Sequence, residues 1–159
     1  MVPLYVSHIR PLLDYCSTVW NLGYRGDLVK LESVQRRWTS EILETTGMEY
    51  AERLRYLNLY SVQGRLLRTD LIKIWKTFHS ELDLGLLDIF DRRSHESTRG
   101  HRYKLAIPRC RTEIRRRFFN VRCVATWNNL PAEVVETQSL EGFKVLLDRV
   151  LGERFYSVG

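Results

Sequence analysis

The sequence lacks the patterns on which most enzyme assignments rest. Nowhere do two acidic residues stand side by side, although paired Mg²⁺ ions at a nucleotidyl-transfer site need clustered carboxylates. The phosphate-cradling Gly-x-x-x-x-Gly-Lys loop, the His-Glu-x-x-His zinc motif and the Gly-x-Ser-x-Gly elbow are also missing. Asp83, Asp88 and Asp91 come close together, but their spacing in an expected loop defines no metal site. We therefore expect no catalysis and no cofactor from this chain alone.

Long apolar runs and paired cysteines are absent as well. No stretch reaches the roughly 18 uninterrupted apolar residues that a membrane span needs. The apolar start Met1–Val6 is too short for a signal core, and His8 and Arg10 interrupt its continuation. The three cysteines stand far apart, which argues against a disulfide framework, and we expect Cys16 and Cys123 to be buried. These features predict an intracellular protein, nuclear or cytoplasmic, with no membrane partner.

Helical periodicity dominates what is present. Apolar residues recur at three- and four-residue steps, and they predict helices over residues 3–20, 28–45, 49–58, 61–80, 118–130 and 139–152. Pro11 lies inside the first helix, so we expect a kink or a break near Ile9–Arg10. Gly152 should end the last helix, because glycine readily adopts the left-handed conformation of a helix end.

One segment has strand character. Tyr103, Leu105 and Ile107 alternate with other residues before Pro108, and Arg111–Arg117 is a candidate second strand. The predicted fold is therefore mainly α: a helical bundle followed by a small α+β C-terminal module with a short hairpin. We expect a bundle over residues 1–80, a flexible basic linker over 81–100, the module over 101–152 and a tail over 153–159.

The positive charge is concentrated in one block. The chain carries a net charge of +6, yet Arg92–Arg122 holds eleven basic residues against only Glu96 and Glu113, about +9, and leaves about −3 for the rest. Ten of the eleven are arginines: Arg92, Arg93, Arg99, Arg102, Arg109, Arg111, Arg115, Arg116, Arg117 and Arg122, beside Lys104. Such a local block is the electrostatic footprint of a phosphate-backbone binder.

Arginine suits this role because its planar fork of donors matches phosphate oxygens and also stacks on bases. Tyr103, Phe118 and Phe119 interleave with the arginines and offer stacking faces for single-stranded nucleic acid. Other interpretations stay open: core aromatics, a solvated arginine face, or an acidic protein partner. His101 is a candidate phosphate or base contact, although its position favours a surface histidine without a special role.

Ordered groups of residues resemble a known family, the non-LTR (LINE-type, jockey-like) retrotransposon reverse transcriptases, in the region after the palm. They are Ile9–Tyr15, Val19–Trp20, Leu31–Arg37, Tyr50–Leu54, Leu57, Leu59, Ser61, Arg65–Leu71, Thr98–His101, Pro108–Arg111, Phe118–Arg122, Val124–Pro131, Ser139–Leu140 and Phe143–Lys144. Each group is short, but together they cover nearly the whole chain in the family's order.

The resemblance implies the thumb and C-terminal region of an RNA-directed DNA polymerase, in which a helical bundle grips the template–primer. The family's Ala/Val-Asp-Asp palm motif, its endonuclease domain and the zinc knuckle of some members have no counterpart in this sequence. The chain is therefore expected to be a fragment of a transposable element, with Mg²⁺ bound only where the palm is present. Its expected partners are template–primer RNA and DNA and the missing palm and endonuclease portion.

Two groups of residues are the predicted contacts. Arg36, Arg37, Lys73 and Lys76 would border a duplex-facing helical surface, and the remaining candidates would hold single-stranded RNA or primer DNA: Arg99, His101, Arg102, Arg109, Arg111, Arg115, Arg116 and Arg117. The alternative function is a protein-interaction or oligomerisation remnant, whose helical stripes pack on a missing palm or on a second copy. That alternative predicts a large apolar patch on the isolated fold.

Overall fold

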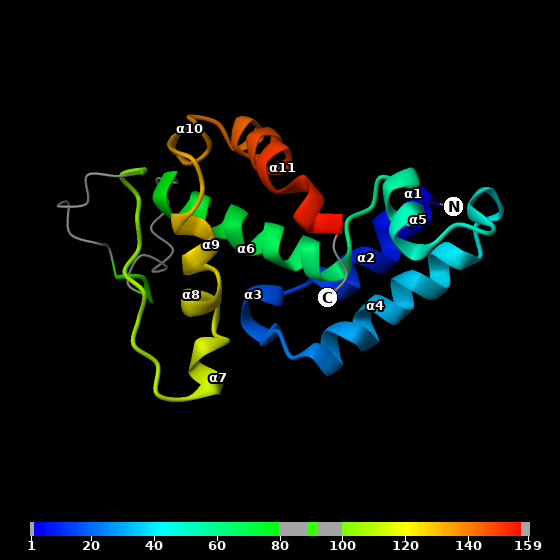
Figure 1. Cartoon of the computed structure of the whole chain (residues 1–159), viewed down its shortest axis with the longest axis horizontal. Coiled ribbons are helices and arrows are strands. Elements are labelled where there is room, and N and C mark those ends of the chain that lie inside the picture. The colour runs from blue at the N-terminus through cyan, green and yellow to red at the C-terminus, as the bar shows by residue number, and fades with distance from the viewer. Residues whose placement is uncertain (1, 80–88, 92–99, 157–159) are drawn as a thin grey trace. The chain divides into compact units, whose positions relative to one another are not determined.

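The computed structural model describes residues 2–79, 89–91 and 100–156, and Figure 1 shows their course. In chain order the elements are α1 (Val2–Leu4), the π-helical turn η1 (Tyr5–Ile9), α2 (Arg10–Asp14), α3 (Ser17–Trp20), α4 (Arg25–Ser40), the 3-10 turn η2 (Leu43–Thr45), α5 (Tyr50–Tyr56), α6 (Val62–His79), α7 (Glu113–Arg116), α8 (Phe119–Arg122), α9 (Val124–Asn128), α10 (Ala132–Val135) and α11 (Leu140–Tyr156). The expectation of a mainly α fold is confirmed.

The chain forms two compact units. Unit 1 consists of Met1–Arg68 with Glu153–Gly159, and unit 2 of Thr69–Gly152. The divisions between them therefore fall inside α6 and α11, whereas the sequence places the boundary in a linker over residues 81–100. Most of that predicted linker, residues 81–88 and 92–99, lies outside the described residues.

The apolar core of unit 1 is small and rich in tyrosine. Tyr5, Tyr50, Leu54 and Leu59 are buried together, and the ring of Tyr5 stacks on Trp38 with 4.4 Å between centroids. A stacked aromatic pair stabilises the fold by more than the burial of its apolar area alone would. This core holds α4 and α5 against the η1 turn.

A buried polar network adds to this core. The Arg65 guanidinium is buried and donates to both carboxylate oxygens of Asp14 over 3.1–3.2 Å. It also donates to the side-chain oxygen of Gln35, which accepts a second hydrogen bond from the Tyr5 hydroxyl at 2.7 Å. The Gln35 amide nitrogen donates to the Tyr60 carbonyl at 2.9 Å. Every side-chain polar atom of Gln35 is thereby used.

Glu32 extends the same network to the start of α6. Its buried carboxylate accepts from the Val62 backbone N–H at 2.8 Å and from the Tyr50 hydroxyl. A carboxylate at a helix start satisfies an otherwise unpaired donor and favours the positive end of the helix dipole. Burial, and then the hydrogen bond to Glu32, raise the pKa of Tyr50, so the phenol stays a donor. We call Asp14, Glu32, Gln35, Tyr50 and Arg65 the buried network.

The first predicted helix is broken in a different place from the expected one. The π-helical turn ends at Ile9, just before Pro11, where an irregularity is expected. The full break comes at Cys16, whose φ of 53° is left-handed. Cys16 itself is exposed, and so are Leu12 and Val19, at 80% and 76%. The prediction that Cys16 is buried is therefore wrong, whereas the same prediction for Cys123 is confirmed.

The last helix is longer than predicted. α11 passes through Gly152 and ends at Tyr156, and Phe155 within it is fully buried. Phe155 belongs to unit 1, where its carbonyl accepts from the Ser61 backbone N–H at 2.9 Å. A Cβ at Gly64 would lie 2.1 Å from that carbonyl oxygen, so only glycine permits the approach. The predicted tail over 153–159 is therefore wrong for residues 153–156.

Aromatic rings dominate the core of unit 2. Trp127 and Phe143 are fully buried and Trp75 nearly so. The ring of Phe143 lies 5.5 Å from Trp75 and 6.3 Å from Trp127, and Phe78 stacks on Trp127 at 5.9 Å. These contacts join α6, α9 and α11 within the unit.

The predicted hairpin does not occur among the described residues, in which Leu105 forms only an isolated bridge. The candidate second strand, Arg111–Arg117, contains the helical turn α7 instead. The extended stretch around Leu105 runs beside α8 and α9 (Figure 1). Asn128 on α9 accepts from the Leu105 N–H at 2.9 Å and donates to the Leu105 carbonyl at 2.8 Å, and the Ala106 N–H donates to the Asp91 carbonyl at 2.7 Å.

Replacing Arg65 by methionine tests the buried network. Arg65→Met keeps most of the side-chain volume but leaves Asp14 with Arg10 as its remaining donor and takes one of the two donors from the Gln35 oxygen. The free energy of unfolding should therefore fall by about 3 kcal/mol. Urea denaturation followed by circular dichroism measures it. Arg37→Met removes an exposed arginine from α4 and should stay within about 0.5 kcal/mol of the original protein. Equal midpoints for the two variants would contradict the role of the network.

Candidate nucleic-acid interface

The stretch from Ile107 to Phe118 of unit 2 carries the densest exposed charge. Arg109, Arg111, Arg115 and Arg116 are all exposed, and we call these four the arginine surface. The stretch ends in α7, whose start is capped by the Thr112 hydroxyl as it accepts from the Arg115 N–H at 3.3 Å. α7 has no buried residue, so it presents its side chains to solvent.

Within the stretch from Ile107 to Phe118, Glu113 is the single carboxylate. Glu113 pairs with Arg116 at 3.4 Å and with Arg117 at 3.2 Å, and Arg117 is only partly exposed. Arg109, Arg111 and Arg115 take part in no ion pair with the described residues. Their positive charge is therefore available to an anion, and phosphate is the anion that arginine matches best.

His101 does not belong to this surface. Its ring is 3% exposed, and its Nε2 lies 3.1 Å from the Trp127 carbonyl. Burial lowers the pKa of His101, the hydrogen bond to the Trp127 carbonyl opposes this effect, and smaller contributions come from Lys104, which lowers the pKa, and Glu136, which raises it. A neutral, buried imidazole cannot meet a phosphate or a base in solvent, so the expectation of a nucleic-acid contact at His101 is corrected to a core role.

Arg122, counted in the basic block, is also structural. Its Nε and Nη2 donate to the two carboxylate oxygens of Asp70 at 2.9 Å each, and its Nη1 donates to the Arg117 carbonyl at 3.1 Å. Burial raises the pKa of Asp70 to about 6 although Arg122 opposes that rise. This pair fastens α8 to α6 within unit 2.

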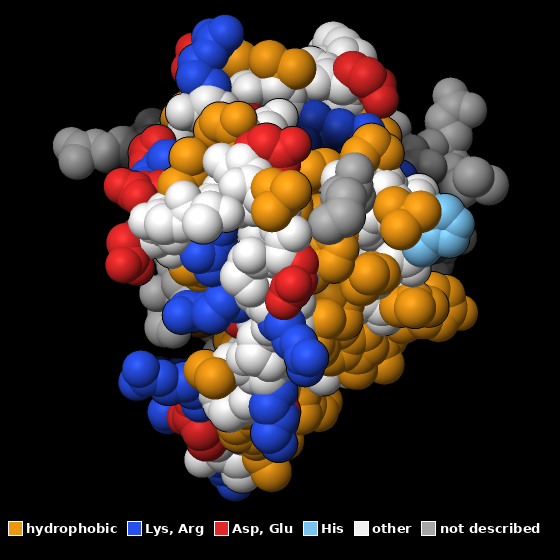
Figure 2. All heavy atoms as spheres, turned by 90° about the vertical axis from the view of Figure 1, so that its right-hand side faces the viewer, with side chains coloured by type: hydrophobic (Ala, Val, Ile, Leu, Met, Phe, Trp, Pro, Cys, Tyr) orange, Lys and Arg blue, Asp and Glu red, His pale blue; other side chains and the backbone are white. Residues whose placement is uncertain are grey.

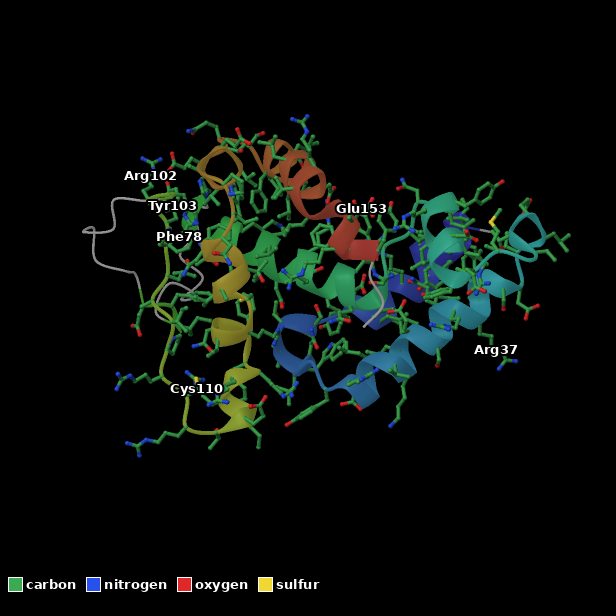
Figure 3. All side chains as sticks on the ribbon, viewed as in Figure 1. Arg37, Phe78, Arg102, Tyr103, Cys110 and Glu153 are labelled. Atoms are coloured by element: carbon green, nitrogen blue, oxygen red, sulfur yellow. The ribbon has the colours of Figure 1, made fainter. Side chains whose placement is uncertain are left out.

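Arg102 is exposed and lies in the basic block ahead of the arginine surface. Its guanidinium lies over the ring of Tyr103, 4.9 Å from the centroid, and Tyr103 itself packs on Phe78 at 5.4 Å. Figure 3 shows Arg102 beside Tyr103 and Phe78, with Cys110 farther along the stretch that leads to α7. Arg99 lies outside the described residues.

The four helical candidates fall in two units. In unit 1, Arg36 and Arg37 are exposed on α4, and Figure 3 shows Arg37 directed away from the helix. The Arg36 guanidinium lies over the Tyr50 ring, 4.6 Å from its centroid. In unit 2, Lys76 is exposed and Lys73 half-buried on α6. The arginine pair and the lysine pair are both accessible to solvent, as contact with the phosphate backbone of a nucleic acid requires.

Sequence reasoning missed a groove along α4. It has a volume of about 620 Å³ and is lined by Gly23, Arg25, Leu28, Val29, Glu32, Ser33, Arg36 and Gln63. Arg25 and Arg36 lie eleven residues apart, three helical turns, which places both on one face of α4. The helical spacing of Arg25 and Arg36 is the signal that could have paired them.

The described residues contain no group of three or more His, Cys, Asp or Glu side chains able to hold a metal ion. Asp83 and Asp88 lie outside them, and Asp91 is exposed. Among the same residues, no helix combines the length and apolar character that crossing a membrane requires. Comparisons with protein-family models, with curated proteins and with solved structures find no match.

The burial of His101 predicts a pH effect on stability. Its folded-state pKa lies below the ordinary value of 6.5, so its contribution is present above pH 6.5 and is lost as the pH falls toward the folded-state pKa. Between about pH 7.5 and 5.5 the original protein should lose more stability than His101→Gln, which cannot titrate, by at most about 1.4 kcal/mol, the limit for one site over the pH unit below 6.5. Urea unfolding of both proteins at the two values measures it, and the comparison cancels the opposite effect of Asp70. Parallel pH profiles would contradict this role.

Proposed function

We propose that this chain binds nucleic acid as the thumb and C-terminal region of a non-LTR retrotransposon-type reverse transcriptase, without the catalytic palm. In this role it holds template–primer RNA and DNA while chemistry, and Mg²⁺, belong to the palm. The observation that carries the proposal is the arginine surface: four exposed arginines within eight residues, with Glu113 as the single carboxylate. The resemblance to that family suggests which nucleic acid is bound, namely the template–primer RNA and DNA.

The distribution of charge supports nucleic acid over a merely solvated face. Solvated surfaces normally mix the two signs, which limits repulsion and keeps proteins soluble. The arginine surface has one sign, and three of its members lack a carboxylate partner among the described residues. A phosphate backbone supplies repeated negative charges, and their neutralisation releases condensed counterions. Binding by such contacts has a defined dependence on salt.

The proposal predicts binding of about micromolar strength or tighter at low salt, with a steep loss as salt rises. Fluorescence anisotropy with a labelled RNA and an RNA–DNA hybrid, between about 50 and 200 mM salt, measures it. The double variant Arg111→Gln/Arg115→Gln removes two phosphate contacts and should lower the log–log salt slope by about 1.4 on a single strand.

A matched control separates local from general charge. Arg149→Gln/Arg154→Gln removes the same net charge from exposed positions of α11 and should leave the slope unchanged. Equal losses in both double variants would mean that only net charge matters. No binding at low salt by the original protein would refute the proposed function.

A second candidate function, a protein-interaction surface, rests on exposed apolar side chains of unit 1. They are Leu4, Val6, Leu12, Tyr15, Val19 and Trp20, each at least 37% exposed. Figure 2 shows hydrophobic side chains gathered over one part of the face that it draws, beside an area richer in Lys and Arg. A large exposed apolar patch commonly marks a site of contact with another protein. The occupant would be the palm or a second copy of the chain.

Self-association distinguishes this candidate. If a second copy covers the apolar face, light scattering should show a dimer that Leu12→Ser/Val19→Ser dissociates. Charge reversal in Arg111→Glu/Arg115→Glu should leave that dimer intact, because the arginine surface takes no part. A monomer at every concentration would exclude the second copy as the occupant.

A further inference from the structure

The structure separates the three aromatic residues that accompany the arginines. Phe119 is 8% exposed and packs edge-on against Phe90, with 5.4 Å between centroids. Tyr103 is half-buried and its ring contacts Phe78 and His79. Phe118 is 40% exposed. Only the last of the three presents a substantial part of its ring to solvent.

Phe118 carries a cation over its ring, and exposed apolar residues occur in the same stretch of chain. The Arg115 guanidinium lies over its ring, 5.2 Å from the centroid, and Ile114, four residues earlier, is 55% exposed. Ile107, at the start of the same stretch, is exposed as well. The exposed side chains of this stretch therefore include both arginines and apolar residues.

This composition distinguishes between forms of nucleic acid. The outside of a duplex offers phosphates and sugars, so a duplex would leave the rings and methyl groups of Phe118 and Ile114 against charge and water. A single strand offers unstacked bases, which pack on aromatic side chains, together with phosphates for the neighbouring arginines. An exposed phenylalanine near arginines therefore strengthens binding to a single strand but not to a duplex.

We propose that Phe118 is a base-stacking residue, and that with Arg111 and Arg115 it forms a site for single-stranded nucleic acid. The inference rests on the proposed function and deepens it, because it assigns base stacking to one exposed ring and ties the arginine surface to single strands. A base packs on the exposed part of the Phe118 ring, and the two guanidinium groups bind the adjoining phosphates. RNA and DNA share this chemistry, so the site accepts either strand.

The test compares Phe118→Leu with Phe118→Trp. Leucine retains apolar volume but has no aromatic face, whereas tryptophan enlarges that face. Affinities are measured for uridine and thymidine oligonucleotides of about 12 nucleotides and for a duplex of equal length, a size within the range of single-strand sites. Phe118→Leu should weaken single-strand binding about 5- to 150-fold, as the loss of one stacked base does, and should leave duplex binding unchanged. Phe118→Trp should keep or strengthen single-strand binding.

Two further measurements make the result specific. The fluorescence of 2-aminopurine placed in the oligonucleotide is quenched by stacking, and this quenching should be lost in Phe118→Leu. Tyr56→Leu, a change at a more exposed aromatic residue in unit 1, should alter neither affinity nor quenching. Thermal unfolding shows whether Phe118→Leu stays folded; if it does not, Phe118→Trp decides alone, and a weaker single-strand affinity in it overturns the proposal.

The outcomes separate this inference from the proposed function. A protein that binds neither single strand nor duplex at low salt refutes both. Equal affinity for the two forms, or equal loss of both in Phe118→Leu, overturns the stacking site while the arginine surface remains a backbone binder. Selective loss of single-strand binding together with the quenching supports the site.

Discussion

The buried hydrogen-bond network of unit 1 is the constraint on which the arrangement of α2, α4, α5 and α6 depends. A guanidinium without water is costly unless each donor finds a partner, and Arg65 finds its partners in Asp14 and Gln35. Glu32 meets the same requirement through the start of α6 and the Tyr50 hydroxyl. These partners come from four separate segments. A rotation of any one helix would therefore leave a buried charge or donor without its hydrogen-bond partner. Apolar packing alone tolerates such rotations, because it lacks direction.

The network also changes the meaning of the family resemblance. Asp14, Glu32, Gln35 and Arg65 all lie within the residue groups that carry it, and all four have structural partners in unit 1. If the resemblance reflects descent, those positions preserve a scaffold, and nucleic-acid contact falls to other residues. The exposed cations of α4 stand directly beside the network, since Arg36 lies over the Tyr50 ring. The rigid polar interior thus gives the helix that carries the predicted duplex contacts a fixed orientation within its unit.

The sequence predicted the structure correctly in segments whose structure depends on local periodicity. It failed in segments whose structure depends on a partner distant in the chain. The wide apolar stripe of α6 predicted its bounds to within one residue at each end. Gly152 was taken as a helix end, but a glycine with no required positive φ can remain helical when the next turn buries Phe155. In the strand-like stretch, the Leu105 backbone bonds the Asn128 side chain 23 residues away, and the Ala106 N–H bonds the Asp91 carbonyl. No local pattern reveals either partner. For the site, the charge count located the arginine surface. It could not separate Arg122 or His101 from it, because their roles come from Asp70 and Trp127.

The arginine surface has an energetic consequence for unit 2. Like charges close together repel, and α7 offsets little of this repulsion, since it has one carboxylate and no buried side chain. Segments with few buried contacts open at low free-energy cost. An anion bound there would remove the repulsion and stabilise the segment, because any ligand that prefers the folded state adds stability. Phe118 strengthens that coupling, since stacking a base would cover a ring that the unliganded unit leaves in water. The arginines that weaken the free segment are therefore the same residues that would make it respond most to a strand of nucleic acid.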